Sequence, residues 1–229
     1  MKVEHAERHP LNLAWLPLLR KMGAKVELQL LRHGFVPAGG GALEVFIQPS
    51  TLAVMAVMAV MAVMAVMALN ERGVVLASEA RVLIGGIDQS VAERELTRVG
   101  NRLDIARESC STVRVDSAES PGNVLLLEYR CEQVTEVFSA FGQVNLRAEA
   151  VADTAVNAAR LWLNSSAAVG EHLADQLLLP MALAGGGSFT TPGMTEHLYS
   201  NIRVIEAFLP LRIACTTAAD GVLQVECRA

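Results

Sequence analysis

The chain has 229 residues and a formal net charge of −5, so no overall basic field attracts a nucleic-acid backbone, and such a partner has to be held locally. Its length allows one large domain or two modest ones with a real hydrophobic core. Its four cysteines form no CxxC pair and no zinc-type cluster with histidine, and the N-terminal stretch lacks an apolar signal segment. We therefore expect reduced thiols and a cytoplasmic location.

The first fifty residues predict a helix followed by a β-hairpin. Residues 11–22, LNLAWLPLLRKM, carry apolar side chains near helical spacing, and Pro17 within them indicates a kink or a late helix start. The stretches KVELQL and ALEVFI both alternate apolar and polar residues, as half-buried strands do. Between them lies RHGFVPAGGG, which predicts a hairpin with a wide, tightly bent loop.

Residues 52–69 form an uninterrupted apolar run built on the repeat Ala-Val-Met. Its length alone would make it a transmembrane candidate. However, weakly apolar alanine dominates, the flanks QPST and NERG lack aromatic or basic anchors, and a period of three fits neither helix nor strand. We expect an expanded repeat within a connector and no association with a membrane.

The middle of the chain alternates predicted strands and helices. VVLASEARVLIGGI predicts a strand that ends at Gly85 and Gly86, and Ser90 and Glu93 have the spacing of a capping box at the start of a helix. NVLLLEYRCE predicts a buried strand. RAEAVADTAVNAARLWL predicts a helix with one apolar face, formed by Val151, Ala155, Ala159 and Trp162.

The C-terminal part predicts two more helices and a hairpin. The helix in SSAAVGEHLADQLLLPMALAG should stop near Pro180, and GGGSFTT should be a flexible or turning stretch. TEHLYSNIRVIEAFL predicts a further helix, and RIACTT and VLQVEC predict a hairpin around ADG. Because no GxGxxG or GxxxxGK[ST] motif is present, we expect an α+β fold with helices on one face of mixed sheets.

Three groups of residues are candidates for chemistry, each with a structural alternative. Gly39, Gly40 and Gly41 expose backbone N–H groups and allow close approach to an anion, or they serve only as a hairpin loop that needs positive φ. Asp175 and Gln176 interrupt an apolar helix; they could hydrogen-bond a base edge or ribose, or simply face solvent. His172 lies three and four residues before them and reaches the same region.

The third candidate is His197, which lies between a glutamate and a leucine in GMTEHLYSNI. It is either a filled core position or a nucleophile. A helix start after TTPGMT places it in the first turn, where the positive end of the helix dipole attracts phosphate and favours the neutral imidazole. A neutral histidine facing a bound nucleotide is able to attack phosphorus.

The stretch HGFVPAGGGAL closely resembles the signature of the RNA 3'-terminal phosphate cyclase family, and SSAAVGEHLADQLLLPMALAGGGSFT and HLYSNIRVIEAFLPLR resemble its C-terminal region in the same order. The resemblance runs from about Leu16 to the C-terminus, interrupted by the Ala-Val-Met run. It implies repeated units of a four-stranded sheet backed by two helices, with a smaller inserted α+β domain. On this chain we expect part of the catalytic body at 1–69, the insert at 70–165 and the C-terminal unit of the body at 166–229.

The resemblance also implies a reaction and its residues. A histidine in the stretch matching HLYSN becomes adenylylated in that family, which points to His197, and the matching ATP-contacting segment is His172, Leu173, Ala174, Asp175 and Gln176. The family is a class of ligases that use ATP and a divalent metal, Mg²⁺ or Mn²⁺. They convert an RNA 3'-terminal phosphate to a 2',3'-cyclic phosphate through a covalent histidine–AMP intermediate.

Two departures keep a second function open. The family's N-terminal section has no counterpart in the match, and position 172 is His where the family commonly has Tyr, so a smaller ring stacks against adenine. The alternative is a catalytically silent cyclase-like scaffold or an RNA-end binding protein.

Overall fold

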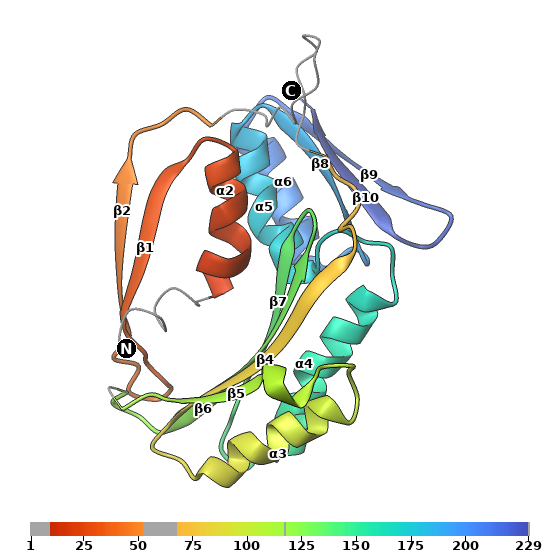
Figure 1. The fold of residues 1–229 in the computed structure, drawn as a ribbon. Coiled ribbons are helices and arrows are strands. Elements are labelled where there is room, and N and C mark those ends of the chain that lie inside the picture. Colours follow the sequence, from red (N-terminus) through yellow and green to blue (C-terminus); the bar gives the residue numbers. More distant parts are fainter. Residues whose placement is uncertain (1–9, 53–67, 117, 229) are drawn as a thin grey trace.

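A computed structural model describes residues 10–52, 68–116 and 118–228 (Figure 1). Within these residues the chain forms two four-stranded sheets, each covered by two helices, and a two-stranded hairpin beside a short helix. The fold is therefore α+β, with repeated units of a four-stranded sheet backed by two helices, as predicted. In the described part of the chain, no helix is both long and apolar enough to cross a bilayer.

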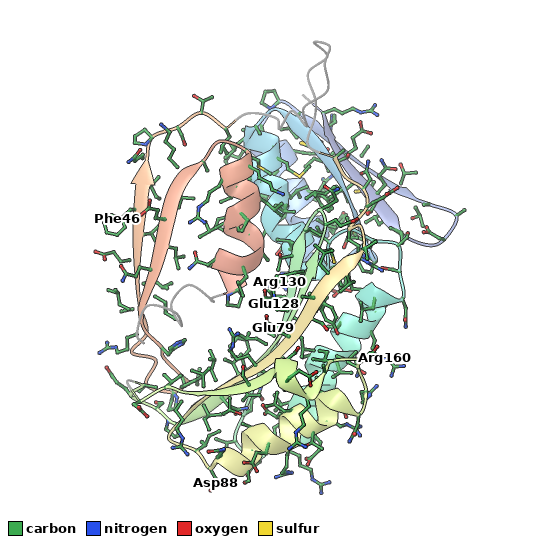
Figure 2. All side chains as sticks on the ribbon, viewed as in Figure 1. Phe46, Glu79, Asp88, Glu128, Arg130 and Arg160 are labelled. Atoms are coloured by element: carbon green, nitrogen blue, oxygen red, sulfur yellow. The ribbon has the colours of Figure 1, made fainter. Side chains whose placement is uncertain are left out.

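The N-terminal elements are a helix and a hairpin, as expected. A π-helical turn, η1 (Leu11–Trp15), runs directly into the short helix α2 (Leu16–Lys21), and Pro17 lies at this junction, in the first turn of α2. The antiparallel strands β1 (Lys25–Arg32) and β2 (Ala42–Gln48) form the hairpin. Phe46 on β2 points away from α2 (Figure 2).

Most of the Ala-Val-Met run, residues 53–67, lies outside the described residues, so its predicted role as a connector stays a prediction. Its last two residues form the short strand β3 (Ala68–Leu69), which pairs in parallel with β8 (Gly186–Thr191). The segment after it leads into the second sheet.

Residues 75–163 build one unit, with strand order β5-β4-β6-β7. Its strands are β4 (Val75–Gly85), β5 (Cys110–Arg114), β6 (Gly122–Cys131) and β7 (Thr135–Phe141), and its helices are α3 (Gln89–Gly100), the short 3₁₀ turn η2 (Arg107–Ser109) and α4 (Ala148–Leu163). The helices α3 and α4 cover one face of the sheet (Figure 1). This unit falls inside the expected insert at 70–165; the division into domains itself stays a prediction.

The start of α3 differs from its prediction. Asp88, not Ser90, is the N-cap, and its carboxylate accepts a hydrogen bond from the Ser90 backbone N–H at 2.9 Å. An ionised carboxylate two residues earlier is a strong cap, so the helix begins at Gln89. The predicted apolar face of α4 is confirmed, because Val151, Ala155, Ala159 and Trp162 are all buried.

The C-terminal unit has strand order β3-β8-β10-β9. Its helices are α5 (Glu171–Leu183) and α6 (Glu196–Phe208), and its closing hairpin is β9 (Arg212–Thr217) and β10 (Leu223–Arg228), as predicted. Leu177, Phe189 and Leu198 belong to the core between helices and sheet. The prediction of a turning stretch in GGGSFTT was wrong: it forms the inner strand β8, because pairing with β3 and β10 on both sides outweighs the low strand propensity of glycine.

The predicted end of a helix at Pro180 was also wrong, since α5 continues to Leu183. Proline has no N–H, so the carbonyl of Gln176, four residues earlier, loses its helical donor. The indole Nε1–H of Trp15, in η1, donates to that carbonyl at 3.0 Å. A side chain from the N-terminal segment thus replaces the missing hydrogen bond and lets the helix pass through the proline.

One arginine joins the two four-stranded units. The guanidinium of Arg72 lies 4.4 Å from the ring centre of Trp162. It donates hydrogen bonds of 2.7–3.0 Å to the carbonyls of Trp162, Leu163, Ser165 and Ala167. These four acceptors include the last carbonyls of α4 and the loop that leads to α5, so Arg72 both caps α4 and fixes the path between the units.

Candidate functional site

The position of His197 follows from the cap of its helix. Thr195 has extended backbone angles, and its hydroxyl accepts a hydrogen bond from the Leu198 N–H at 3.0 Å. The helix therefore starts at Glu196, which confirms the prediction that His197 lies in the first turn. Leu198 is buried and anchors the helix, whereas His197 is exposed to solvent. The imidazole is not a filled core position.

The two helices α5 and α6 begin at the same end of the sheet. Just before α5, the N–H groups of Ala168 and Val169 donate to the hydroxyl and carbonyl of Thr190, at 2.9 and 3.0 Å. Thr190 is next to the last residue of β8, and α6 starts five residues after that strand ends. Both positive helix ends therefore gather at the C-terminal end of β8, which makes this edge favourable for an anionic ligand.

A polar contact joins the two helices near that end. The amide Nδ2 of Asn201 donates a hydrogen bond to Oδ1 of Asp175. Asn201 lies four residues after His197 and so on the same face of α6. The contact therefore brings Asp175 next to the helix face that carries the histidine. Sequence reasoning missed Asn201, although the i, i+4 spacing in HLYSN was a signal for it.

The other predicted residues of α5 divide into two groups. His172 and Gln176 are exposed and four residues apart, so they share one face of α5. Leu173 and Ala174 belong to the hydrophobic core, with 2% and 0% of their surface exposed. The side chains of these two residues therefore pack in the core. Of the five predicted residues of α5, only His172, Asp175 and Gln176 have side chains that a ligand can contact.

The glycine loop lies elsewhere. In Figure 1 it connects β1 and β2 at the lower left, away from α5 and α6. Gly39 and Gly40 have positive φ, of 69° and 71°, and the Gly39 N–H donates to the Phe35 carbonyl at 2.8 Å. The adjacent Ala38 N–H donates to the Ser120 hydroxyl at 3.0 Å. These contacts give the loop a structural reason for its glycines; anion binding by Gly39, Gly40 and Gly41 stays a prediction.

A buried carboxylate that the sequence did not suggest caps α5. Gly170, the N-cap residue, has no side chain, and Oε2 of Glu136 on β7 accepts its backbone N–H at 2.6 Å. Burial raises the pKa of Glu136 to about 7, although this bond and one from the Val137 N–H favour the charged form. The cap ties the neighbouring sheet to the helix end where the candidate site lies.

The described residues offer no obvious metal site. Among them, no three His, Cys, Asp or Glu side chains gather closely enough to hold a metal ion. We therefore assign no residue to the expected Mg²⁺ or Mn²⁺.

Comparison with known proteins identifies the family. The sequence profile of RNA 3'-terminal phosphate cyclase matches residues 6–215. The chain belongs to the RNA 3'-terminal phosphate cyclase family. It is 61% identical over 219 residues to a Pseudomonas fluorescens protein named RNA 3'-terminal phosphate cyclase, covering 96% of this chain and 60% of the relative.

Two further relatives carry the same name. The chain is 52% identical to the Ectopseudomonas mendocina protein, and the match covers 95% of this chain and 60% of that relative. It is 41% identical to the Salmonella enteritidis protein, and that match covers 91% of this chain and 58% of the relative. The chain thus spans about 60% of the length of these cyclase relatives. The resemblance to the family noted in the sequence is confirmed.

Proposed function

We propose that this chain acts in the ATP-dependent conversion of an RNA 3'-terminal phosphate to a 2',3'-cyclic phosphate, with His197 as the residue that carries AMP. The observation that supports this most directly is an exposed imidazole in the first turn of α6, beside the contact that joins Asn201 to Asp175. In a member of the cyclase family, this arrangement suits covalent transfer of a nucleotide.

The chemistry requires activation because a terminal phosphate monoester has no good leaving group. A nitrogen of His197 attacks the α-phosphorus of ATP; a phosphorus–nitrogen bond forms and pyrophosphate leaves. An oxygen of the RNA 3'-phosphate then attacks the same phosphorus, which breaks the phosphorus–nitrogen bond and restores the imidazole. Finally the neighbouring 2'-hydroxyl loses its proton, its oxygen attacks the 3'-phosphorus, and AMP departs as the ring closes.

The polar residues at the N-terminal ends of α5 and α6 each have a role in this proposal. The N-terminal turns of α5 and α6 direct partial positive charge at the triphosphate. Asn201 holds one oxygen of Asp175 through a hydrogen bond, and the other oxygen of that carboxylate accepts a hydrogen bond from a ribose hydroxyl. Gln176 adds a hydrogen-bonding amide, and the ring of His172 lies against adenine.

A divalent metal, Mg²⁺ or Mn²⁺, would supply charge neutralisation on the triphosphate. Because the described residues contain no cluster suited to hold it, no step above depends on a protein-bound ion.

The proposal is tested by incubating the folded chain with α-labelled ATP and metal, followed by denaturation. We expect label bound to the protein and mapped by mass spectrometry to the peptide that contains His197. His197→Ala should lose the label, whereas Val204→Ala, an exposed change on the same helix, should keep it. A well-folded chain that takes up no label but binds RNA ends would contradict the proposal and favour the silent scaffold.

A further inference from the structure

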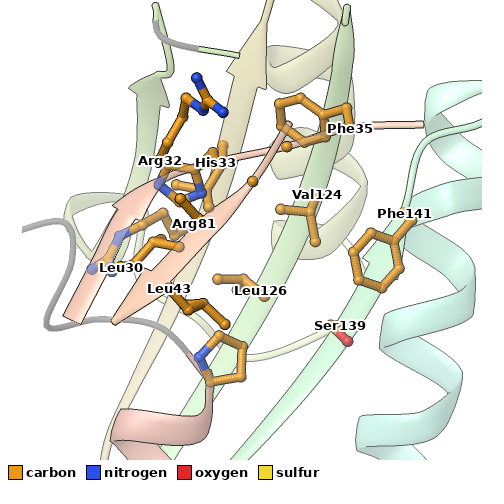
Figure 3. Close-up of a pocket in the computed structure, with 15 residues that line it drawn as sticks. Leu30, Arg32, His33, Phe35, Leu43, Arg81, Val124, Leu126, Ser139 and Phe141 are labelled. Carbon is orange, nitrogen blue, oxygen red and sulfur yellow. The ribbon is translucent and has the colours of Figure 1, made fainter. Parts of the chain in front are cut away.

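A pocket of about 420 Å³ lies between the β1–β2 hairpin and the face of β4, β6 and β7 that α3 and α4 leave open (Figure 3). Its volume falls in the range of small-ligand sites, which is roughly 300 to 1,000 Å³. Val124 and Leu126 form its floor on the sheet, and Leu30 and Leu43 face them from the hairpin. Leu83 of β4 also lines the pocket. None of these residues belongs to the edge that carries His197.

Two aromatic rings border the pocket. Phe35 packs directly on the sheet backbone, because a Cβ added to Gly122, the first residue of β6, would lie 2.6 Å from its Cγ. Phe141, at the end of β7, is 63% exposed although it lines the cavity. A fixed ring and an accessible ring beside an aliphatic floor form a surface on which a flat base stacks, whatever its sequence identity.

The pocket lining itself carries basic side chains, and the carboxylates that pair with its two arginines, Glu119 and Glu79, lie just outside that lining. The fifteen residues that line the pocket include Arg32, His33 and Arg81 but no aspartate or glutamate, in a chain whose net charge is −5. Arg32 forms an ion pair with Glu119 at 3.3 Å, and both side chains are about half exposed. Such exposed pairs contribute little to stability, so Arg32 can exchange its carboxylate for a phosphate at small cost.

Strand β7 connects the pocket with the edge where His197 lies. Glu136 near its start caps α5, and Ser139 and Phe141 further along line the pocket. At the rise of a β-strand these two residues are roughly 10 to 17 Å along the strand from Glu136. By strand alternation Glu136 lies on the face of the sheet that α4 covers, whereas Ser139 and Phe141 lie on the opposite face, and β7 is the edge strand of that sheet. A nucleic-acid strand whose end lies at the N-termini of α5 and α6 therefore reaches the pocket by crossing this edge.

We propose that this pocket binds a nucleotide of single-stranded RNA located upstream of the reacting 3' end. Its base stacks on Phe141 and the apolar floor, and its phosphate lies beside Arg32 and His33. The site favours longer RNAs without selecting a base sequence, because its floor is apolar and forms few hydrogen bonds with base edges. This inference rests on the proposed function, since it places the second contact of the same RNA.

The test compares binding of a 3'-phosphorylated RNA hexamer and of the dinucleotide with the same 3' end, by fluorescence anisotropy without ATP. We expect Phe141→Ala and Arg32→Gln to weaken hexamer binding by roughly tenfold and to leave dinucleotide binding unchanged. Phe208→Ala and Arg160→Gln, matched exposed changes far from the pocket, should alter neither. Equal hexamer affinity in the wild type and both pocket variants would overturn the inference.

Cross-linking gives an independent readout that needs no variant. Hexamers with 4-thiouridine at successive positions should cross-link to the peptides containing Phe35 or Phe141 only from positions upstream of the 3' end. Cross-links to these peptides from the terminal nucleotide alone would contradict the proposal. Labelling by α-labelled ATP separates the two ideas: unchanged labelling in Phe141→Ala with weakened hexamer binding supports both, and pocket-dependent RNA binding without any labelling rejects only the adenylylation.

Discussion

The two helix pairs of this chain cover similar sheets and both pack on apolar cores, but they differ in the polar contacts between their helices. Helices α3 and α4 meet along a seam of charged side chains, with Arg94 bound to Glu149 and both Arg98 and Arg102 bound to Asp153 at 2.6–2.9 Å. Helices α5 and α6 meet through buried apolar residues, and the one side-chain hydrogen bond described between them joins Asn201 to Asp175.

The difference teaches where the chain keeps polar groups available. In the α3–α4 seam each carboxylate is already matched by a guanidinium. At the N-terminal end of α5 and α6, the imidazoles of His172 and His197 are exposed and hydrogen-bond to no other described residue. A pair stabilised by apolar packing leaves such groups uncommitted, which a binding or reacting site requires.

The largest expected effect comes from cutting the link between the two pairs. Arg72→Met should lower the free energy of unfolding by about 3 to 5 kcal/mol, because four carbonyls around the end of α4 lose a charged donor. Urea denaturation measures it. Arg160→Met, an exposed change on α4, should shift the midpoint little; similar losses in both variants would show that Arg72 is no special link.

A pH-dependent effect should follow at the cap of α5. Burial raises the pKa of Glu136 to about 7, above its ordinary value of 4.5, so the folded state holds the proton more tightly. The carboxyl therefore costs no stability below about pH 4.5, and stability falls as pH rises from there to about 7. Glu136→Gln, which mimics the protonated form, should stabilise the chain by about 1 to 3 kcal/mol at pH 8.

Denaturation curves at pH 4.5 and pH 8 test this directly. The difference between the two proteins should nearly vanish at the lower pH, where wild-type Glu136 is protonated in the folded state and half protonated in the unfolded state. Glu95 has a pKa raised to about 7 by the same cause and remains in both proteins, so it serves as an internal background. A constant difference at both values would mean that the carboxyl group does not titrate in this window.

A smaller effect is expected at the start of α6. Thr195→Ala removes the hydroxyl that accepts the Leu198 N–H and should cost about 1 kcal/mol. Because the cap fixes the turn that carries His197, labelling by ATP should also slow, and Thr195→Ser should restore both. Thermal melts and labelling time courses measure the two effects; normal labelling in the alanine variant would separate the cap from the chemistry.

The smallest effect should come from the charged seam. Asp153→Asn removes the carboxylate shared by Arg98 and Arg102, whose hydrogen bonds and charge lower its pKa to about 2. The loss of stability should be modest at low salt and shrink at high salt, as for exposed ion pairs. Wild-type stability from this group is retained above its ordinary pKa and lost as pH falls toward 2. An effect unchanged by salt would argue for packing rather than charge.

Local patterns predicted much of the fold. The apolar spacing of α4 and α6, the two hairpins and the turn before His197 all depend on neighbours in sequence, and the structure confirms them. The same locality explains why His197 could be placed in a first turn without coordinates. The half-buried face expected of β2 was wrong, because Leu43, Val45 and Ile47 are exposed. Asn201, one helical turn after His197, was not predicted because its role depends on a contact with Asp175 on another helix.

The failures concern interactions between distant parts of the chain. Gly186 and Gly187 form a strand only because β10 pairs with them. Glu136 caps α5 from a strand 34 residues earlier in the sequence. The pocket beside Phe141 exists because the hairpin lies over an open sheet face, and the apolar periodicity of the sequence does not predict that placement. Such features depend on tertiary placement rather than on local preference.

The passage of α5 through Pro180 makes two remote positions interdependent. Replacing the proline by alanine would return an amide to the helix and make the indole of Trp15 dispensable there; losing the indole first would leave the Gln176 carbonyl without its donor. Loss of the Trp15 indole is therefore tolerated only after Pro180 has been replaced. It also follows that the helix bearing Asp175 completes its bonding only when the beginning of the chain has come into place against it.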